Sequence, residues 1–229
     1  MTDVQLPDDL REMVQRDLQP VRPVASPFHR TTIVAGVSLL IMAALVATSA
    51  LRSDLATLPI WLGWGSSAVE IMLGLALVCA AVREGIPAAS LPLGLRWVLL
   101  AGAVLVNFAT AVVTWLHSQG AASTHQACLG YVCLRSELLL ALPALALTLF
   151  LVVRAYPLRP SMAGLFGGAG AGLLADGVEH LLCPVSDLTH VLVWHTGAIF
   201  LLMFFGWLAG TIWEVLRDGN HRPPNRQKR

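Results

Sequence analysis

The run TIVAGVSLLIMAALVATSAL, residues 32–51, contains no charged residue. An α-helix needs about 20 such residues to cross the hydrocarbon core of a bilayer. The run lacks a strict alternation of apolar and polar residues, and an open sheet could not satisfy its backbone hydrogen bonds in lipid. It therefore predicts a membrane-spanning helix, and further runs of this kind predict an all-α fold.

The composition of the whole chain agrees with a membrane protein. Hydrophobic residues make up 56% and charged residues 13%, against about 25% charged in soluble domains. Because Gly and Ala are common in packed spans, we expect six spans, at residues 32–51, 59–82, 96–117, 137–154, 162–182 and 189–213. The expected fold is thus an integral membrane six-helix bundle. The membrane domain (31–213) lies between a cytoplasmic leader with an amphipathic helix (1–30) and a basic cytoplasmic tail (214–229).

The basic residues predict the orientation of these spans. With the N-terminus inside, 13 of the 15 Lys and Arg residues fall in cytoplasmic segments, and only Arg52 and Arg135 fall outside. Cytoplasmic loops accumulate Lys and Arg, so we expect both termini in the cytoplasm. The charged leader does not resemble a signal peptide, and the first span should remain as an anchor. The near-neutral net charge of +1 conceals this asymmetry. We expect the basic tail after Asp218 to lie against the anionic headgroups of the lipid bilayer, and we expect no nucleic acid as a partner.

Ionisable groups gather where the fifth and sixth spans meet the outer surface, in ADGVEHLLCPVSDLTHVLVWH, residues 175–195. At 100° per residue, one helix face carries four of them within about 100°. These four residues are Asp176, Glu179, His180 and Cys183. His190 and His195 open the sixth span, but a separation of five predicts that they do not share a face. The preceding outer loop adds Cys128, Cys133 and Glu137, while Glu70 and Asn107 are polar residues inside spans.

Two kinds of chemistry suit this outer group. Zinc and copper favour thiolate and imidazole ligands, and Cys183, His180 and His195 are the candidate ligands of a transiently bound ion. Alternatively, in an oxidising compartment, Cys128 or Cys133 forms a disulfide with Cys183. A simpler alternative is that the histidines anchor the chain at the interface and the thiols pack as small apolar groups. No resident cofactor is predicted.

The leader, LPDDLREMVQRDLQPVRPV at residues 6–24, predicts a short amphipathic helix followed by prolines. Its apolar face consists of Leu6, Leu10, Met13, Val14 and Leu18. Such a helix can dock into the groove of a partner protein. It can equally lie on the membrane surface.

Several segments, in their order along the chain, resemble the membrane-embedded anti-sigma factors of the negative regulator of sigma F family. They are the leader, VREGIPAASLP (82–92), the stretch from Gln126 to Gly164, and GAGAGLLADGVEHLLCPVSDLTHVLVWHTGAI (168–199). Together they cover most of the chain.

The resemblance implies a regulator of the bacterial inner membrane and no enzymatic activity. It would hold an ECF-type sigma factor at the cytoplasmic face and release it when outer cysteines meet heavy metal or oxidant. The sensing cysteines would be Cys183 and one of Cys128 and Cys133, since this chain has two cysteines where the family has one. The leader and the loop with Arg83 and Glu84 would contact the sigma factor.

Two other functions fit the residues. A membrane thiol oxidoreductase also carries outer cysteines on a helical bundle, although neither outer loop here has a C-x2-C pair. A haem-binding or metal-transporting bundle would use His180, His190 or His195 with Glu70.

Overall fold

The computed structural model describes residues 25–86, 89–117 and 126–220, of which 126–129 and 218–220 by backbone only, and leader residues 10, 12, 13 and 16. Regular structure in these segments is entirely helical, without any β-strand, which confirms the predicted all-α class. The long helices are α2 (Pro27–Thr48), α3 (Ser66–Glu84), α4 (Leu93–His117), α5 (Gln126–Val153), α6 (Pro160–Leu182) and α8 (Gly197–Asn220).

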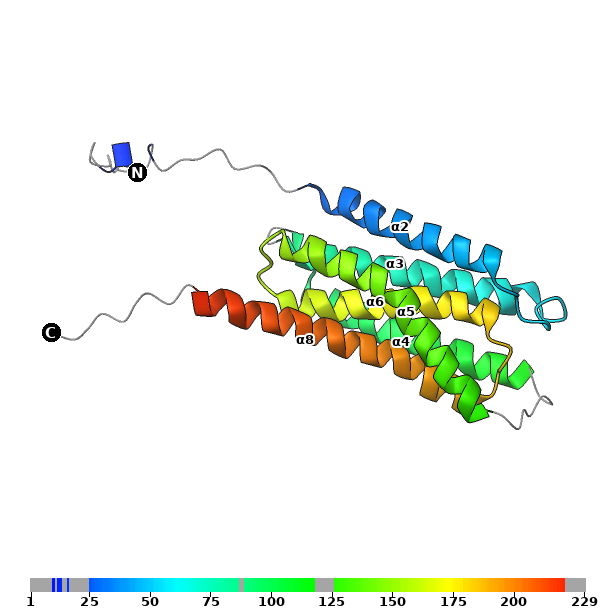
Figure 1. The fold of residues 1–229 in the computed structure, drawn as a ribbon. Coiled ribbons are helices and arrows are strands. Elements are labelled where there is room, and N and C mark those ends of the chain that lie inside the picture. Colours follow the sequence, from blue (N-terminus) through cyan, green and yellow to red (C-terminus); the bar gives the residue numbers. More distant parts are fainter. Residues whose placement is uncertain are drawn as a thin grey trace.

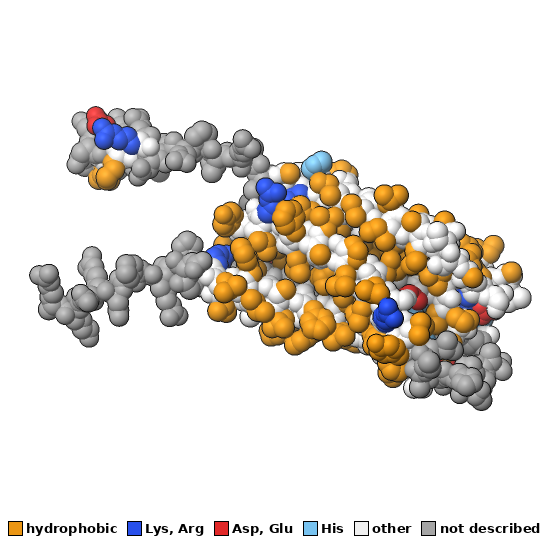
Figure 2. All heavy atoms as spheres, viewed as in Figure 1, with side chains coloured by type: hydrophobic (Ala, Val, Ile, Leu, Met, Phe, Trp, Pro, Cys, Tyr) orange, Lys and Arg blue, Asp and Glu red, His pale blue; other side chains and the backbone are white. Residues whose placement is uncertain are grey.

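Five helical segments are long and apolar enough to cross a membrane: Pro27–Thr48, Trp61–Glu84, Leu93–His117, Gly130–Val153 and Leu188–Arg217. Their outer surfaces are apolar, as Leu40 and Met72 illustrate with 72% and 70% of their side chains exposed. Hydrophobic side chains cover most of the visible face of the bundle (Figure 2). Soluble monomers rarely expose apolar patches of this extent, so the chain is a membrane protein.

Helix α6 runs through the middle of the bundle and packs against α3, α5 and α8 (Figure 1). Nineteen of its 23 residues are buried. Its glycines permit this close packing, because a Cβ at Gly170 would lie 2.8 Å from the Gly74 carbonyl oxygen of α3. A Cβ at Gly168 would overlap the Leu202 carbonyl of α8. Helix α6 covers the predicted fifth span, but it is not among the five apolar segments. The reason is that its glycines and two carboxylates lower its mean hydropathy.

The two ends of the bundle differ in what they bring together. The first residues of α2 and the last turns of α8 lie at the same end (Figure 1). At the opposite end, Arg52 joins the loop after α2 to the C-terminal end of α6, since its backbone N–H donates to the Leu181 carbonyl over 3.0 Å. Its guanidinium also donates to Ser186 over 2.7 Å. This contact holds the loop after α2 against the end of α6 and the loop that follows it.

Helix α5 corrects the predicted outer loop. It begins at Gln126, whereas the fourth span was predicted to begin at residue 137. Cys128, Cys133 and Glu137 therefore lie on a helix and not in a loop. The physical reason is that no proline interrupts residues 126–142, and the charged Glu137, which suggested the end of a loop, is fully buried.

The start of the last long helix corrects a second prediction. A short helix, α7 (Leu188–His190), is followed by a π-helical turn, η3 (Val191–Thr196), before α8 begins. The hydrogen bonds of a π-turn join residues five apart, so such residues lie on about the same side. The ring centroids of His190 and His195 are 5.5 Å apart. The prediction that they do not share a face was wrong because it assumed the 100° step of an α-helix.

Candidate functional site

The ionisable face of α6 points into the bundle. Asp176 is fully buried, and Glu179, His180 and Cys183 are each no more than 9% exposed. Helices α3, α4, α5 and α7 and the π-turn η3 supply the side chains around this face. An ionisable group inside a membrane protein is costly unless it has a partner, so the partners of these residues define the site.

Cys183 follows the last residue of α6 and faces Cys133 of α5. Their Sγ atoms lie 3.4 Å apart, and both residues are free thiols. The Nε2 atom of His190 lies 3.6 Å from the Cys183 sulfur. With His195, these residues bring two sulfur and two nitrogen atoms within 4.8 Å of one another. The structure thus places Cys133 beside Cys183, whereas the side chain of Cys128 lies outside the described residues.

His195 connects the thiols to buried carboxylates. Its Nδ1 atom lies 3.1 Å from Asp176 Oδ1 and 3.3 Å from Glu137 Oε2. Its other nitrogen, Nε2, is buried and has no hydrogen-bond partner among the described side chains. Carboxylates that hold one imidazole nitrogen fix the tautomer and leave the other nitrogen free to act as a ligand.

A second carboxylate and imidazole pair lies deeper in the bundle. Glu70 of α3 is fully buried, and its Oε2 atom lies 3.0 Å from His180 Nδ1. Thr110 of α4 donates to the other oxygen of Glu70 over 2.7 Å. Together with Asp176, these groups place three ligand-type atoms within 4.8 Å of one another. His180 therefore faces Glu70, while His190 and His195 lie beside the thiols.

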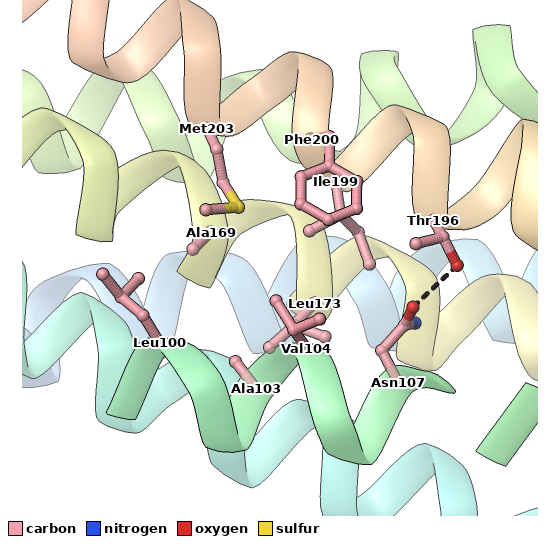
Figure 3. A pocket seen from close by; sticks show the side chains of 10 residues that line it. All are labelled: Leu100, Ala103, Val104, Asn107, Ala169, Leu173, Thr196, Ile199, Phe200 and Met203. Atoms are coloured by element: carbon pink, nitrogen blue, oxygen red, sulfur yellow. Dashed lines mark hydrogen bonds between the residues drawn. The ribbon is translucent and has the colours of Figure 1, made fainter. Parts of the chain in front are cut away.

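Asn107 of α4 ties Asp176 to the π-turn η3. Its amide nitrogen donates to Asp176 Oδ2 over 2.7 Å, and its amide oxygen accepts a 2.7 Å hydrogen bond from Thr196. Figure 3 shows this second bond at one end of an apolar cavity of about 20 Å³ between α4, α6 and α8. Leu173 and Ile199 are among the side chains that line the cavity. Apolar side chains of α4, α6 and α8 thus border the polar network next to Asn107.

The hydrogen bonds around Cys183 change its acidity. The hydrogen bond with the Cys133 thiol lowers the pKa of the Cys183 thiol, and the nearby imidazoles of His190 and His195 act in the same direction, against the effect of burial. A thiolate is both the nucleophilic and the metal-binding form of cysteine. A lowered pKa favours the thiolate form of Cys183.

Comparison with known protein families identifies the class of this chain. A family model described as negative regulator of sigma F matches residues 15–216. The chain belongs to the negative regulator of sigma F family. No curated protein and no solved structure matches it. Membership confirms the predicted family, makes a sigma factor the partner, and points to a regulator in place of an enzyme.

In this negative regulator of sigma F, part of the predicted sigma-binding surface can be located. Leu10 and Met13 are helical and 40% and 58% exposed. Arg83 is exposed at the end of α3, but Glu84 is 2% exposed and accepts a 2.9 Å hydrogen bond from Arg96. Only Arg83 of that pair therefore presents its charge at the surface. Leu6, Val14 and Leu18 lie outside the described residues.

Three residues of the buried network were absent from the predicted sensing set: Glu70, Asn107 and Glu137. Each is buried and contacts one of the predicted residues. Their position in the sequence could have identified them, because a charged or amide side chain within an apolar helix indicates a functional or paired group. Their partners on other helices could not be read from local spacing.

Proposed function

We propose that this negative regulator of sigma F is an anti-sigma factor of the bacterial inner membrane. It holds an ECF-type sigma factor at its cytoplasmic face and releases it when Cys133 and Cys183 react with a heavy metal or an oxidant. The observation that carries the proposal is the thiol pair at 3.4 Å. The pair lies at the end of α6, away from the start of α2 and the end of α8 (Figure 1).

The proposed topology has six crossings, with α6 as the fifth. Its 23 residues correspond to about 34 Å of helix, enough for a hydrocarbon core of about 30 Å. An even number of crossings puts both termini on one side. The 13 of 15 basic residues on that side support a cytoplasmic location for the termini.

Oxidation would change the geometry at the thiol pair. A disulfide requires sulfur atoms about 2.05 Å apart, against 3.4 Å here. Hydrogen peroxide would take two electrons from the two thiols: the two S–H bonds and the O–O bond break, one S–S bond forms, and two water molecules leave. The new bond would pull α5 toward the end of α6. A soft metal ion bound by the same atoms would act on the same two helices.

Helix α6 is the proposed link between the sensor and the partner. It begins at Pro160, near the end where α2 starts, and ends directly before Cys183. Its close contacts at Gly168 and Gly170 join it to α8 and α3. A shift of α6 would therefore move both neighbours, which gives two helix arrangements for the two states of the sensor. The sigma factor would respond through the leader, where Leu10 and Met13 are exposed, and through Arg83.

The test is co-purification of ECF-type sigma factors with the full-length protein from membranes. We expect capture under reducing conditions and release after cadmium, copper, zinc or peroxide. Cys133→Ser and Cys183→Ser should retain the sigma factor after treatment, whereas Cys79→Ser, at a half-buried position of α3, should release it as the wild type does. The proposal fails if no sigma factor co-purifies, or if the Cys183 variant still releases it.

The thiol pair also supports a second candidate, a membrane thiol oxidoreductase. Two free thiols at 3.4 Å can cycle between dithiol and disulfide. Quinone reduction by the purified protein, coupled to oxidation of the pair, would favour this candidate. Family membership favours the regulator.

A further inference from the structure

We propose that Cys133, Cys183, His190 and His195 form a closed four-ligand site for one zinc ion. The inference deepens the proposed function, on which its role in signalling rests, by naming the ion and the complete ligand set of the sensor. Binding of the ion itself requires no sigma factor. The ligand set differs from the one predicted by sequence, because His190 takes the place of His180.

The distances between the ligand atoms suit a tetrahedral zinc ion. With Zn–S of about 2.3 Å and Zn–N of about 2.0 Å, a tetrahedron has sulfur atoms about 3.8 Å apart and sulfur and nitrogen about 3.6 Å apart. The two sulfur atoms here lie 3.4 Å apart. Cys183 Sγ and His190 Nε2 lie 3.6 Å apart, and all four atoms lie within 4.8 Å of one another. Small side-chain rotations would complete the tetrahedron.

The orientation of His195 is an independent indication of a ligand. Its Nδ1 atom donates to Asp176 over 3.1 Å, and Glu137 lies 3.3 Å from the same nitrogen. The proton is thus held on Nδ1, and the lone pair of Nε2 is directed toward the thiols. His195 is 1% exposed, and its Nε2 atom lacks a hydrogen-bond partner among the described residues. Metal-binding histidines are typically held by a carboxylate in this way.

Charge selects a divalent ion over a monovalent one. Two thiolates carry two negative charges, which Zn²⁺ balances and Cu⁺ does not. An unbalanced charge in a buried site is costly, and Glu137, Asp176 and Glu179, all within the same buried region, would add to that cost. A set of two sulfur and two nitrogen ligands in a tetrahedron is characteristic of zinc. Four protein ligands leave no open position, as in non-catalytic zinc sites.

The ion has a route to the site. A groove of about 750 Å³ between α2, α5 and the end of α6 is lined by both cysteines and by Glu179. Cys133 is only partly buried, so its sulfur is the first of the four ligands that an entering ion meets. Ser136 donates a hydrogen bond to Glu179 on the wall of this groove.

The test uses the reduced full-length protein in detergent, with Co²⁺ as a spectroscopic probe for Zn²⁺. We expect one Co²⁺ per chain, with the intense absorption of tetrahedral thiolate coordination, and stoichiometric displacement by Zn²⁺. Cys133→Ser, Cys183→Ser, His190→Gln and His195→Gln should each lose this absorption. Glu137→Gln should keep the absorption but weaken Zn²⁺ affinity by about 10-fold to 100-fold, as for other residues that hold a metal-binding histidine.

Matched variants make the outcome decisive. Cys79→Ser and His180→Gln should bind Co²⁺ as the wild type does, and thermal unfolding without metal should show that each variant is folded. Octahedral Co²⁺ spectra, retained absorption in both histidine variants, or loss of absorption only in Cys128→Ser would overturn the zinc site. Because the assay contains no sigma factor, a failure to capture sigma factor would leave its result unchanged. A protein that captures and releases sigma factor but binds neither Co²⁺ nor Zn²⁺ would refute the zinc site alone.

Discussion

Asp176 is the residue on which the buried network depends. One carboxylate oxygen accepts from Asn107 and the other from His195, so both of its partners are donors. In Asp176→Asn, the new amide N–H would face one of these donors. A buried group left without its hydrogen bond costs about 1 to 3 kcal/mol. We therefore expect a loss of unfolding free energy of this size, measured by denaturant unfolding in detergent.

Asp187 provides the control for this substitution. Its side chain caps α7 by accepting from the His190 backbone N–H over 3.1 Å. Asparagine caps helices about as well as aspartate, so Asp187→Asn should leave the stability nearly unchanged. Equal losses for the two variants would contradict the role assigned to Asp176.

Arg52 and Asp54 give the outer loops a pH dependence. Hydrogen bonds from Arg52 lower the pKa of Asp54 below its ordinary value of 3.8. Because the folded pKa is the lower one, the stabilisation is present above the unfolded pKa and is lost as the pH falls through the folded pKa. Asp54→Asn should therefore be less stable than the wild type at pH 7, with a difference that shrinks below about pH 4.

The size of this effect is limited by solvent. The Asp54 side chain is 38% exposed, and exposed ion pairs contribute up to about 1 kcal/mol. Thermal unfolding of both proteins across this pH range measures the difference. A difference that grew in acid would have the wrong sign for a lowered pKa.

Among the elements, long runs of apolar and small residues were predictable. The run at 32–51 became α2, and the Gly-rich run at 162–182 became α6. Two elements, the start of α5 and the π-turn η3, could not be predicted from apolar content alone. Near its start α5 carries Arg135, Ser136 and the buried Glu137 in succession, which gives a loop-like sequence. The π-turn at Val191–Thr196 has no composition of its own. Both errors affected the site, because they changed where Cys133, His190 and His195 point.

The central position of α6 leads to a prediction about its glycines. A Cβ at Gly168 would overlap the Leu202 carbonyl of α8, so Gly168→Ala must separate the two helices. Overpacking of this kind costs about 1 to 3 kcal/mol. On α4, a Cβ at Gly102 would meet nothing within 4 Å, and Gly102→Ala should stabilise the helix by up to about 1 kcal/mol. Opposite shifts in the thermal midpoint are expected, and equal shifts would contradict close packing at Gly168.

At the scale of the whole molecule, the site could be predicted only in part. Local spacing placed Asp176, Glu179, His180 and Cys183 on one face of α6, and all four are buried. The choice of Cys133 as the neighbour of Cys183, and the pairing of Glu70 with His180, depend on which helices are adjacent. Helix adjacency in a membrane is set by small-residue packing and polar contacts between helices. The sequence of a single span does not show which helix its small or polar residues will contact.

The role of α6 as a crossing can be tested on the intact chain. If α6 spans the membrane, the loop at Leu158 before it and the loop at Ser186 after it lie on opposite sides. Alkaline phosphatase is active only outside the inner membrane, so a fusion at Ser186 should be active and a fusion at Leu158 inactive. Green fluorescent protein, which fluoresces when it folds inside, should give the reverse result. The loop at Thr57 and the C-terminus serve as outer and inner references. Equal activity at Leu158 and Ser186 would remove α6 as a span, and with it the route by which Cys183 could influence a cytoplasmic partner.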